Sequence, residues 1–250
     1  MVIKQVAVDL SNYCSKTCPF CYNQSSKAGG TSWKADEVLS FCLDCHRHGV
    51  EAVSLGGGEP LEYGDLFAVI DGLRDELYVT VTTNGLRLDD AAFFSSFVSH
   101  LPDKLHLSLH HPTKPEEMER ILRQVHRLEP YEVNVGVNLL VSVHTLEPAG
   151  EVYRRLLREK VSPDRIILVP MKPNETPTGL QLAEMTGGRP FQAPSCLQGC
   201  RKPQFFCSVS WDKKANWCGY APGKVPLSSL NWKGLVDALG QVDFRTCHEA

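Results

Sequence analysis

The chain has 250 residues, of which 42% are hydrophobic and 22% charged, and its formal net charge at pH 7 is −3. Such a composition is typical of globular proteins, and without clustered Lys and Arg it argues against nucleic acid as a partner. No run approaches the roughly 20 apolar residues of a bilayer-spanning helix, and no signal peptide is visible. We therefore expect a cytoplasmic protein without a membrane partner, in which ten Cys residues indicate metal binding rather than disulfides.

Strand-like and helix-like segments alternate through the first two thirds of the chain. The expected strands are Val2–Leu10, Ala52–Leu55, Val79–Thr83, Lys104–Leu109, Val133–Val143 and Arg165–Pro170. The expected helices are Trp33–His48, Leu66–Leu77, Asp89–Val98, Pro115–Leu128 and Glu147–Glu159. This alternation predicts an α/β fold of parallel βα units. Because a closed barrel needs eight units, six predict an open, partial (β/α)6 barrel.

The pattern changes after the sixth expected strand. We therefore expect residues 1–173 to form the barrel and residues 174–250 to form a small extension that closes it. The extension begins with a connection rich in Pro and Gly. Phe205–Ser210 and Ala215–Cys218 flank a turn and predict a hairpin. A short helix is expected over Leu235–Leu239 near the end of the chain.

Three cysteines, Cys14, Cys18 and Cys21, follow the first expected strand with CxxxCxxC spacing. Thiolates this close together suit one metal centre. A structural zinc site wants four ligands, and no fourth Cys or His lies nearby in the sequence. A [4Fe–4S] cluster is normally held by four Cys residues, so a cluster held by three keeps one iron open. The spacing therefore predicts an iron–sulfur centre with a free coordination position.

The cysteine loop, Tyr22 directly after it, and Gly57-Gly58-Glu59-Pro60 at the end of the second strand resemble the signature of the radical S-adenosylmethionine (radical SAM) superfamily. The resemblance implies a partial barrel with its chemistry at the carboxyl ends of the strands. It implies that the three cysteines hold a [4Fe–4S] cluster whose open iron binds SAM. Reductive cleavage of SAM then gives a 5′-deoxyadenosyl radical, which abstracts hydrogen from a C–H bond of the substrate.

The same resemblance assigns SAM-binding roles to residues at the strand ends. Gly57, Gly58 and Glu59 are expected at the ammonium group of the SAM methionine, since glycines let backbone carbonyls approach closely. The other expected SAM contacts are Tyr22, Asn84, Ser108, Asn138 and Met171. Asn84 belongs to a Thr-Asn-Gly run that is equally well explained as a turn, and Asn138 is equally explained as a core amide with a partner in the protein.

The sequence leaves the catalytic residues of the substrate step unassigned. His110 follows the fourth strand and is a candidate proton donor or substrate ligand, with an ordinary loop position as the alternative. Lys172 closes the sixth strand and is a candidate to bind a substrate anion. The substrate itself is expected to be a small molecule or a peptide, and the reductant a protein such as flavodoxin or ferredoxin.

Half of the ten cysteines lie in the last quarter of the chain: Cys196, Cys200, Cys207, Cys218 and Cys247. A hairpin bracketed by Cys and followed by a later Cys resembles the auxiliary-cluster regions, of the SPASM or twitch type, that some radical SAM enzymes carry. This resemblance implies a second Fe–S cluster on Cys200, Cys207, Cys218 and Cys247, although the region has no CxxC pair. Buried free thiols and a zinc site are the alternatives.

The reaction outcome depends on that second cluster. With it, we expect an oxidation or the modification of a peptide or natural product, because a second cluster can accept the electron of the substrate radical. Without it, we expect a redox-neutral epimerisation or rearrangement. The alternative to an enzyme is a non-catalytic Fe–S electron-transfer protein. The Gly-Gly-Glu-Pro segment argues against this alternative.

Overall fold

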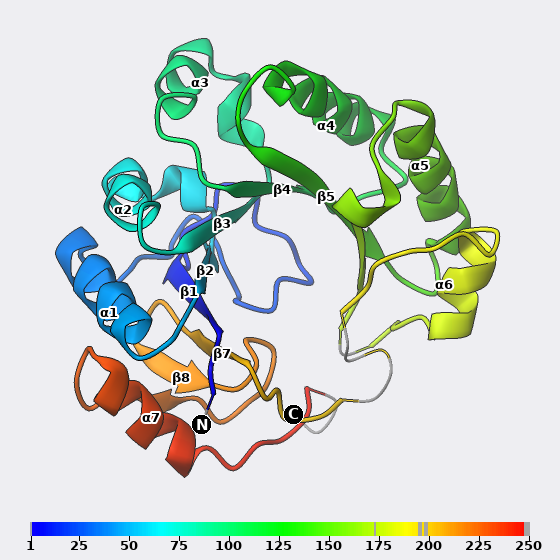
Figure 1. Cartoon of the computed structure of the whole chain (residues 1–250). Coiled ribbons are helices and arrows are strands. Elements are labelled where there is room, and N and C mark those ends of the chain that lie inside the picture. The colour runs from blue at the N-terminus through cyan, green and yellow to red at the C-terminus, as the bar shows by residue number, and fades with distance from the viewer. Residues whose placement is uncertain (1, 173, 195–196, 198–199, 248–250) are drawn as a thin grey trace.

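A computed structural model describes residues 2–172, 174–194, 197 and 200–247. Within these residues one nine-stranded sheet runs in the order β6-β5-β4-β3-β2-β1-β7-β8-β9. Its six parallel barrel strands, β1 to β6, are Gln5–Ser11, Ala52–Gly57, Tyr78–Thr83, Lys104–Leu109, Asn134–Val141 and Ile166–Pro170. These strands neighbour one another in chain order and form a curved, open wall with the helices outside it (Figure 1). The predicted partial (β/α)6 barrel is confirmed.

The helices that alternate with these strands are α1 (Ala35–Arg47), α2 (Leu66–Leu73), α3 (Ala91–Phe97), α4 (Pro115–Leu128) and α5 (Leu146–Arg158), with short 3-10 helices η1 (Pro60–Glu62), η2 (Leu86–Asp89) and η3 (Pro163–Arg165). They bury apolar stripes against the outer face of the sheet, as α4 does with Ile121, Val125 and Leu128. No helix in the described part of the chain is long and apolar enough to cross a membrane.

The two faces of the barrel strands differ in chemistry. On β4, Leu105, Leu107 and Leu109 are fully buried, whereas the alternate residues Lys104, His106 and Ser108 line the interior of the barrel. Parallel strands buried on both faces are usually apolar throughout. A polar inner face therefore indicates that the concave side of the sheet surrounds a ligand site rather than a packed core.

The C-terminal residues extend the sheet on the far side of β1. β7 (Phe206–Val209) pairs with β1 in parallel, and β8 (Lys214–Asn216) and β9 (Val225–Pro226) continue antiparallel. The expected hairpin is therefore present, and its first strand joins the barrel sheet. The last helix, α7 (Trp232–Gln241), is longer than expected and contacts α1.

One α-helix within the described residues was not predicted. α6 (Gly179–Met185) lies in the segment expected to be a connection, and it packs against α5. It begins with a capping box between Thr178 and Gln181. That Thr-x-x-Gln spacing is a signal of a helix start, which was available in the sequence.

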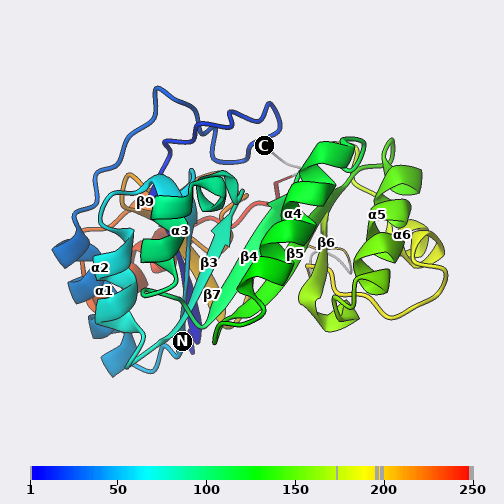
Figure 2. The same cartoon turned by 90° about the horizontal axis from the view of Figure 1, so that it is seen from above.

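The cysteine loop between β1 and α1 lies across the carboxyl ends of the barrel strands (Figure 2). Two backbone hydrogen bonds fix its start: Gly58 N donates to Ser11 O at 2.6 Å and Glu59 N to Tyr13 O at 2.8 Å. A Cβ on Gly58 would lie 1.9 Å from Tyr13 O, and Gly57 has a φ of +108°. The glycines are thus required because the turn after β2 packs directly on the backbone of the loop.

Gly58→Ala is therefore expected to lower the free energy of unfolding by about 1–3 kcal/mol, the usual cost of forcing extra atoms into a packed site. Urea unfolding of the metal-free chain measures this change. Gly64→Ala is the matched control, because a Cβ at Gly64 meets no atom within 4 Å. Equal stability of the two variants would contradict the proposed fit between turn and loop.

Candidate functional site

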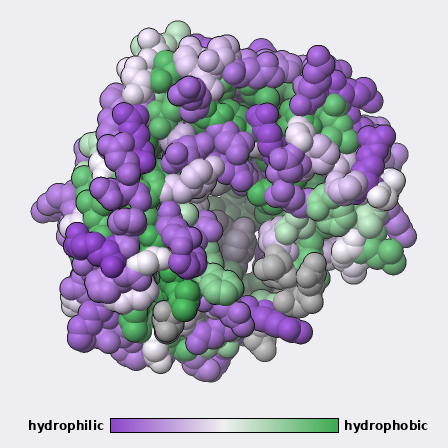
Figure 3. Space-filling view, in the orientation of Figure 1, coloured by the Kyte–Doolittle hydropathy of each residue, from purple (hydrophilic) through white to green (hydrophobic). Residues whose placement is uncertain are grey.

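The concave side of the sheet encloses a cavity of about 710 Å³, visible as the hollow at the centre of Figure 3. Its walls come from the barrel strands, the cysteine loop and parts of the C-terminal extension. With the late cysteines set aside, every residue that the sequence assigned to a cluster, to SAM or to the substrate lines this cavity. These residues are Cys14, Cys18, Cys21, Tyr22, Gly57, Gly58, Glu59, Asn84, Ser108, His110, Asn138, Met171 and Lys172.

The three thiols of the cysteine loop face this cavity with different surroundings. Cys14 is buried and lies 3.8 Å from Asn84 Nδ2, while Cys18 is half-buried and lies 4.0 Å from His110 Nδ1. Burial raises the pKa of both thiols. Thiolate binding to a metal would offset that burial cost.

This donor set fits a cluster better than a single ion. Among the described residues, no three His, Cys, Asp or Glu side chains converge on one ion position. Cysteines that hold a [4Fe–4S] cluster each bind a different iron, so their sulfurs need not converge. Soft thiolate ligands also suit iron–sulfur clusters.

Glu59 joins the turns that follow β2 and β3. Its buried carboxylate accepts hydrogen bonds from Leu61 N at 3.0 Å, Asn84 N at 2.7 Å and the Thr83 hydroxyl. Burial outweighs these bonds and raises the pKa of Glu59 to about 7. The carboxylate thus has a structural task of its own, while the backbone of Gly57 and Gly58 borders the cavity.

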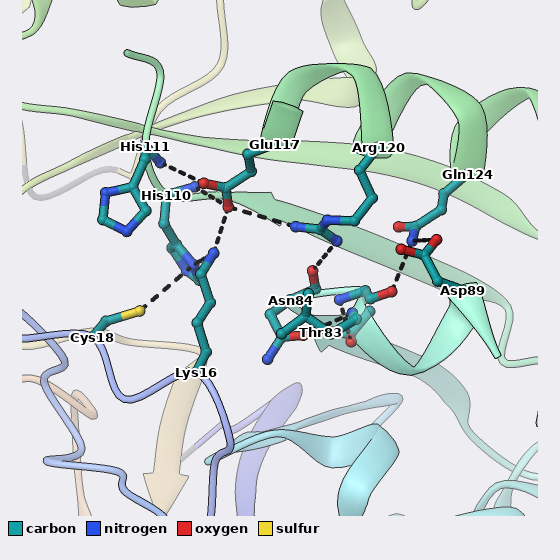
Figure 4. A network of polar contacts seen from close by, with 12 residues as sticks. Lys16, Cys18, Thr83, Asn84, Asp89, His110, His111, Glu117, Arg120 and Gln124 are labelled. Atoms are coloured by element: carbon teal, nitrogen blue, oxygen red, sulfur yellow. Dashed lines mark hydrogen bonds and ion pairs between the residues drawn. The ribbon is translucent and has the colours of Figure 1, made fainter. Parts of the chain in front are cut away.

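A buried ion-pair network attaches the cysteine loop to α4 (Figure 4). Lys16, between two of the cysteines, pairs with Glu117, and Lys16 Nζ also lies 3.0 Å from His110 Nδ1. The Glu117 carboxylate accepts from the backbone N–H of His110 and His111 at 3.2 and 3.1 Å. Arg120 NH2 lies 3.7 Å from Glu117, and its NH1 donates to Asn84 O at 2.7 Å. Sequence reasoning missed Lys16, Glu117 and Arg120.

His110 is a neutral imidazole within this network. Its pKa is lowered to about 4, first by burial and then by the Lys16 charge. Because an ammonium can only donate, Nδ1 of His110 accepts from Lys16 and the ring proton is assigned to Nε2. His110 can therefore donate a hydrogen bond from Nε2 at neutral pH.

Glu117→Ala is expected to lower the free energy of unfolding by about 3–5 kcal/mol, because it leaves Lys16 buried without its counter-charge. Chemical denaturation measures the loss. The control is Glu116→Ala, one residue earlier on the exposed face of α4, with an expected loss below about 1 kcal/mol. A Glu117 variant as stable as this control would rule out the network as a tether of the loop.

Asn138 has a partner in the protein, as its core-amide interpretation requires. Its Oδ1 lies 2.7 Å from His106 Nδ1, and both side chains line the cavity. Burial lowers the pKa of His106 to about 4, and its Nε2 has no hydrogen-bond partner in the described structure. His106 was not among the predicted site residues.

His106 should make stability depend on pH. The folded chain keeps it neutral down to about pH 4, whereas an unfolded His takes up a proton near pH 6.5. The contribution of neutral His106 to the free energy of unfolding is therefore complete above about pH 6.5. It is lost as pH falls toward 4, by about 3 kcal/mol. Chemical unfolding at pH 6.5 and at pH 4 should show that the free energy of unfolding falls by about 3 kcal/mol more in wild type than in His106→Gln. Equal losses in wild type and His106→Gln would disprove this role of His106. The control is His144→Gln, which changes an exposed histidine.

A second polar cluster lies at the β1 side of the cavity. Tyr22 donates its hydroxyl to Asp9 Oδ1 at 3.2 Å, and its ring stacks on Tyr220 with centroids 4.5 Å apart. Asp9, Tyr22 and Tyr220 all line the cavity. Sequence reasoning included Tyr22 and missed the other two, because a single Asp in an alternating strand carries no distinctive signal.

Among the described residues, none of the late cysteines lines the cavity. Cys207 is fully buried on β7, and Cys45 of α1 lies close enough to add to the effect of burial in raising the pKa of the Cys207 thiol. Cys200, Cys218 and Cys247 are half-buried, and Cys196 lies outside the described residues. Cys42 and Cys45 are buried on one face of α1, as expected for core residues.

Comparison with known proteins identifies a family and similar sequences. A family model described as the radical SAM superfamily matches residues 8–135, just over half of the chain. A probable GTP 3′,8-cyclase of Methanocella arvoryzae is 32% identical over 107 residues, which cover 43% of this chain and 34% of that protein. A probable GTP 3′,8-cyclase of Halobacterium salinarum is 34% identical over 99 residues, covering 36% and 27%. The match thus spans about a third or less of these relatives.

Solved structures share the fold at low sequence identity. Streptococcus suis SuiB bound to S-adenosylmethionine superimposes with a TM-score of 0.70 at 15% identity, over 87% of this chain and 60% of that one. Native anSMEcpe with bound AdoMet gives 0.65 at 14% identity, over 94% and 80%. At such identities the likeness establishes the architecture alone.

Proposed function

The chain belongs to the radical SAM superfamily, and from that premise we propose that it is an enzyme that cleaves SAM reductively and removes a hydrogen atom from a substrate C–H bond. The family implies a [4Fe–4S] cluster and SAM as cofactors. When bound, they would supply one chemistry: one electron from the cluster breaks a C–S bond of SAM, which leaves methionine and a carbon-centred radical able to abstract hydrogen. The protein's own residues bind, orient and shield the reactants.

We assign the cluster to Cys14, Cys18 and Cys21, which all line the cavity. The backbone of Gly57 and Gly58 offers carbonyl acceptors for the SAM ammonium, and Glu59 keeps this turn in place through its hydrogen bonds to the turn after β3. The other proposed SAM contacts are Tyr22, Asn84, Ser108, Asn138 and Met171. His110 and Lys172 remain the candidates for contact with the substrate.

One observation carries the proposal: the three thiols, the glycine turn and a row of polar strand-end residues all border a single cavity. A simple electron carrier needs a cluster close to the surface and has no use for such a space. The volume of the cavity falls in the usual range of ligand pockets, about 300–1,000 Å³. It therefore favours an enzyme over the electron-transfer alternative.

For the reaction, we propose an oxidation or the modification of a peptide or natural product. The support comes from neighbours that share the fold: SuiB has been solved with its precursor peptide SuiA, and anSMEcpe with the Kp18Cys peptide. The cyclase relatives are named for action on GTP, but the match covers about a third of their length. Residues 1–173 are proposed as the catalytic core, with a cytoplasmic reductant such as flavodoxin or ferredoxin.

Cys18→Ala is expected to abolish formation of 5′-deoxyadenosine from SAM under anaerobic reducing conditions while the chain stays folded, because Cys18 lies in a loop outside the apolar core. Chromatography of the reaction and circular dichroism of the protein measure the two properties. Cys42→Ala, which removes a thiol from the core beneath α1, should retain cleavage. Unchanged 5′-deoxyadenosine yield in Cys18→Ala would refute the assignment.

Iron analysis of the same preparations separates the two reaction classes. A second cluster on Cys200, Cys207, Cys218 and Cys247 would require Cys207 to leave its packing beside Cys45. About four irons in wild type, lost in a Cys14/Cys18/Cys21→Ala variant, would favour the redox-neutral alternative of epimerisation or rearrangement. About eight irons, with four kept in the variant, would favour oxidation.

A further inference from the structure

Asp9 on β1 has a hydrogen-bonding capacity that the protein leaves unused. The residue is 5% exposed and lines the cavity. Its Oδ1 accepts from the Tyr22 hydroxyl at 3.2 Å, whereas its buried Oδ2 has no partner in the described structure. No ion pair to Asp9 exists among the described residues, and Lys224 acts on it only through longer-range attraction.

The surroundings of Asp9 keep its carboxylate open to the cavity. Gly56 is its register partner on β2, and even a Cβ built there would stay 3.7 Å from Asp9 Oδ1. The neighbouring strand therefore offers no side chain to cover the carboxylate. On the other side, the stacked rings of Tyr22 and Tyr220 form an aromatic wall.

A buried carboxylate without a counter-charge is costly unless a ligand supplies one. Burial raises the pKa of Asp9 to about 6, so that the group is still mainly an anion at neutral pH. A ligand cation beside this anion would regain a charge-assisted hydrogen bond, and the tyrosine faces would attract the same positive charge. A phosphate-bearing ligand would instead meet charge repulsion at this wall.

We propose that Asp9, with the Tyr22–Tyr220 pair, binds a protonated primary amine of the substrate, such as a lysine side chain. The site adjoins the glycine turn assigned to SAM, because a Cβ at Gly57 would lie 3.0 Å from Asp9 Cα and Cβ, and it shares Tyr22 with the proposed SAM contacts. It defines the substrate class of the function proposed above, on which it rests. Asp9 then orients the substrate through its ammonium group and leaves the C–H chemistry to the cofactors.

The test compares two probes that differ only in the ammonium group: Nα-acetyl-lysine methylamide and Nα-acetyl-norleucine methylamide. Equilibrium dialysis against the cluster-loaded protein with SAM, at neutral pH, gives both dissociation constants. We expect wild type to bind the lysine probe at least about tenfold more tightly, equivalent to about 1.4 kcal/mol. Asp9→Asn should abolish this preference. Asp212→Asn, a nearby carboxylate outside the cavity lining that pairs with Lys214, should keep it.

Equal binding of the two probes by wild type would overturn the proposal without any variant, so it stays decidable even if Asp9→Asn does not fold. A lysine preference that survives in folded Asp9→Asn would also overturn it. If the substitution weakens SAM rather than the probe, the carboxylate serves the SAM ammonium and the proposal is wrong. Failure of SAM cleavage by wild type would instead contradict the proposed function and leave the probe result to be judged separately.

Discussion

The close contact between the turn after β2 and the backbone that follows β1 determines how the rest of the site is arranged. Gly58 and Glu59 donate backbone hydrogen bonds to Ser11 and Tyr13, so the β1–β2 pairing continues past the end of the sheet. Only glycine allows so close an approach, because any Cβ at Gly58 would overlap the Tyr13 carbonyl. The cysteine loop therefore leaves the sheet in a defined direction, across the carboxyl ends of the strands, and its thiols face the cavity.

Pairing between strands stabilises part of the polar lining of the barrel. His106 bonds Asn138 across β4 and β5, and Glu59 bonds Thr83 at the ends of β2 and β3. Each pair offsets the cost of removing polar groups from water. The apolar half of each strand meets the helices outside, so the sheet keeps its core on one face and its chemistry on the other.

The sequence was most informative where the signal is local. The alternation of βα units predicted the barrel, and the spacings CxxxCxxC and Gly-Gly-Glu-Pro predicted which strand ends border the cavity. Contacts between distant positions were not readable: Lys16 and Glu117 meet only because the fold brings α4 next to the cysteine loop (Figure 4). Cys207 shows a third kind of signal. Side chains alternate between the two faces of a strand, so the position of a residue along β7 decides which face it occupies. Phe206 faces the cavity, and Cys207 therefore faces α1.

Among the described residues, Asp9 and Glu59 are the two carboxylates that line the cavity, and burial raises the pKa of both. Their roles nevertheless differ. Glu59 receives three donors, two of them backbone N–H groups at the ends of neighbouring elements, so the fold itself uses the charge. Asp9 lies near the carboxyl end of β1, opposite a glycine, and receives a single hydroxyl. An interior anion that the protein holds with one donor has capacity left for a ligand. The number of donors thus separates the carboxylate that builds the site from the one that is available to recognise what enters it.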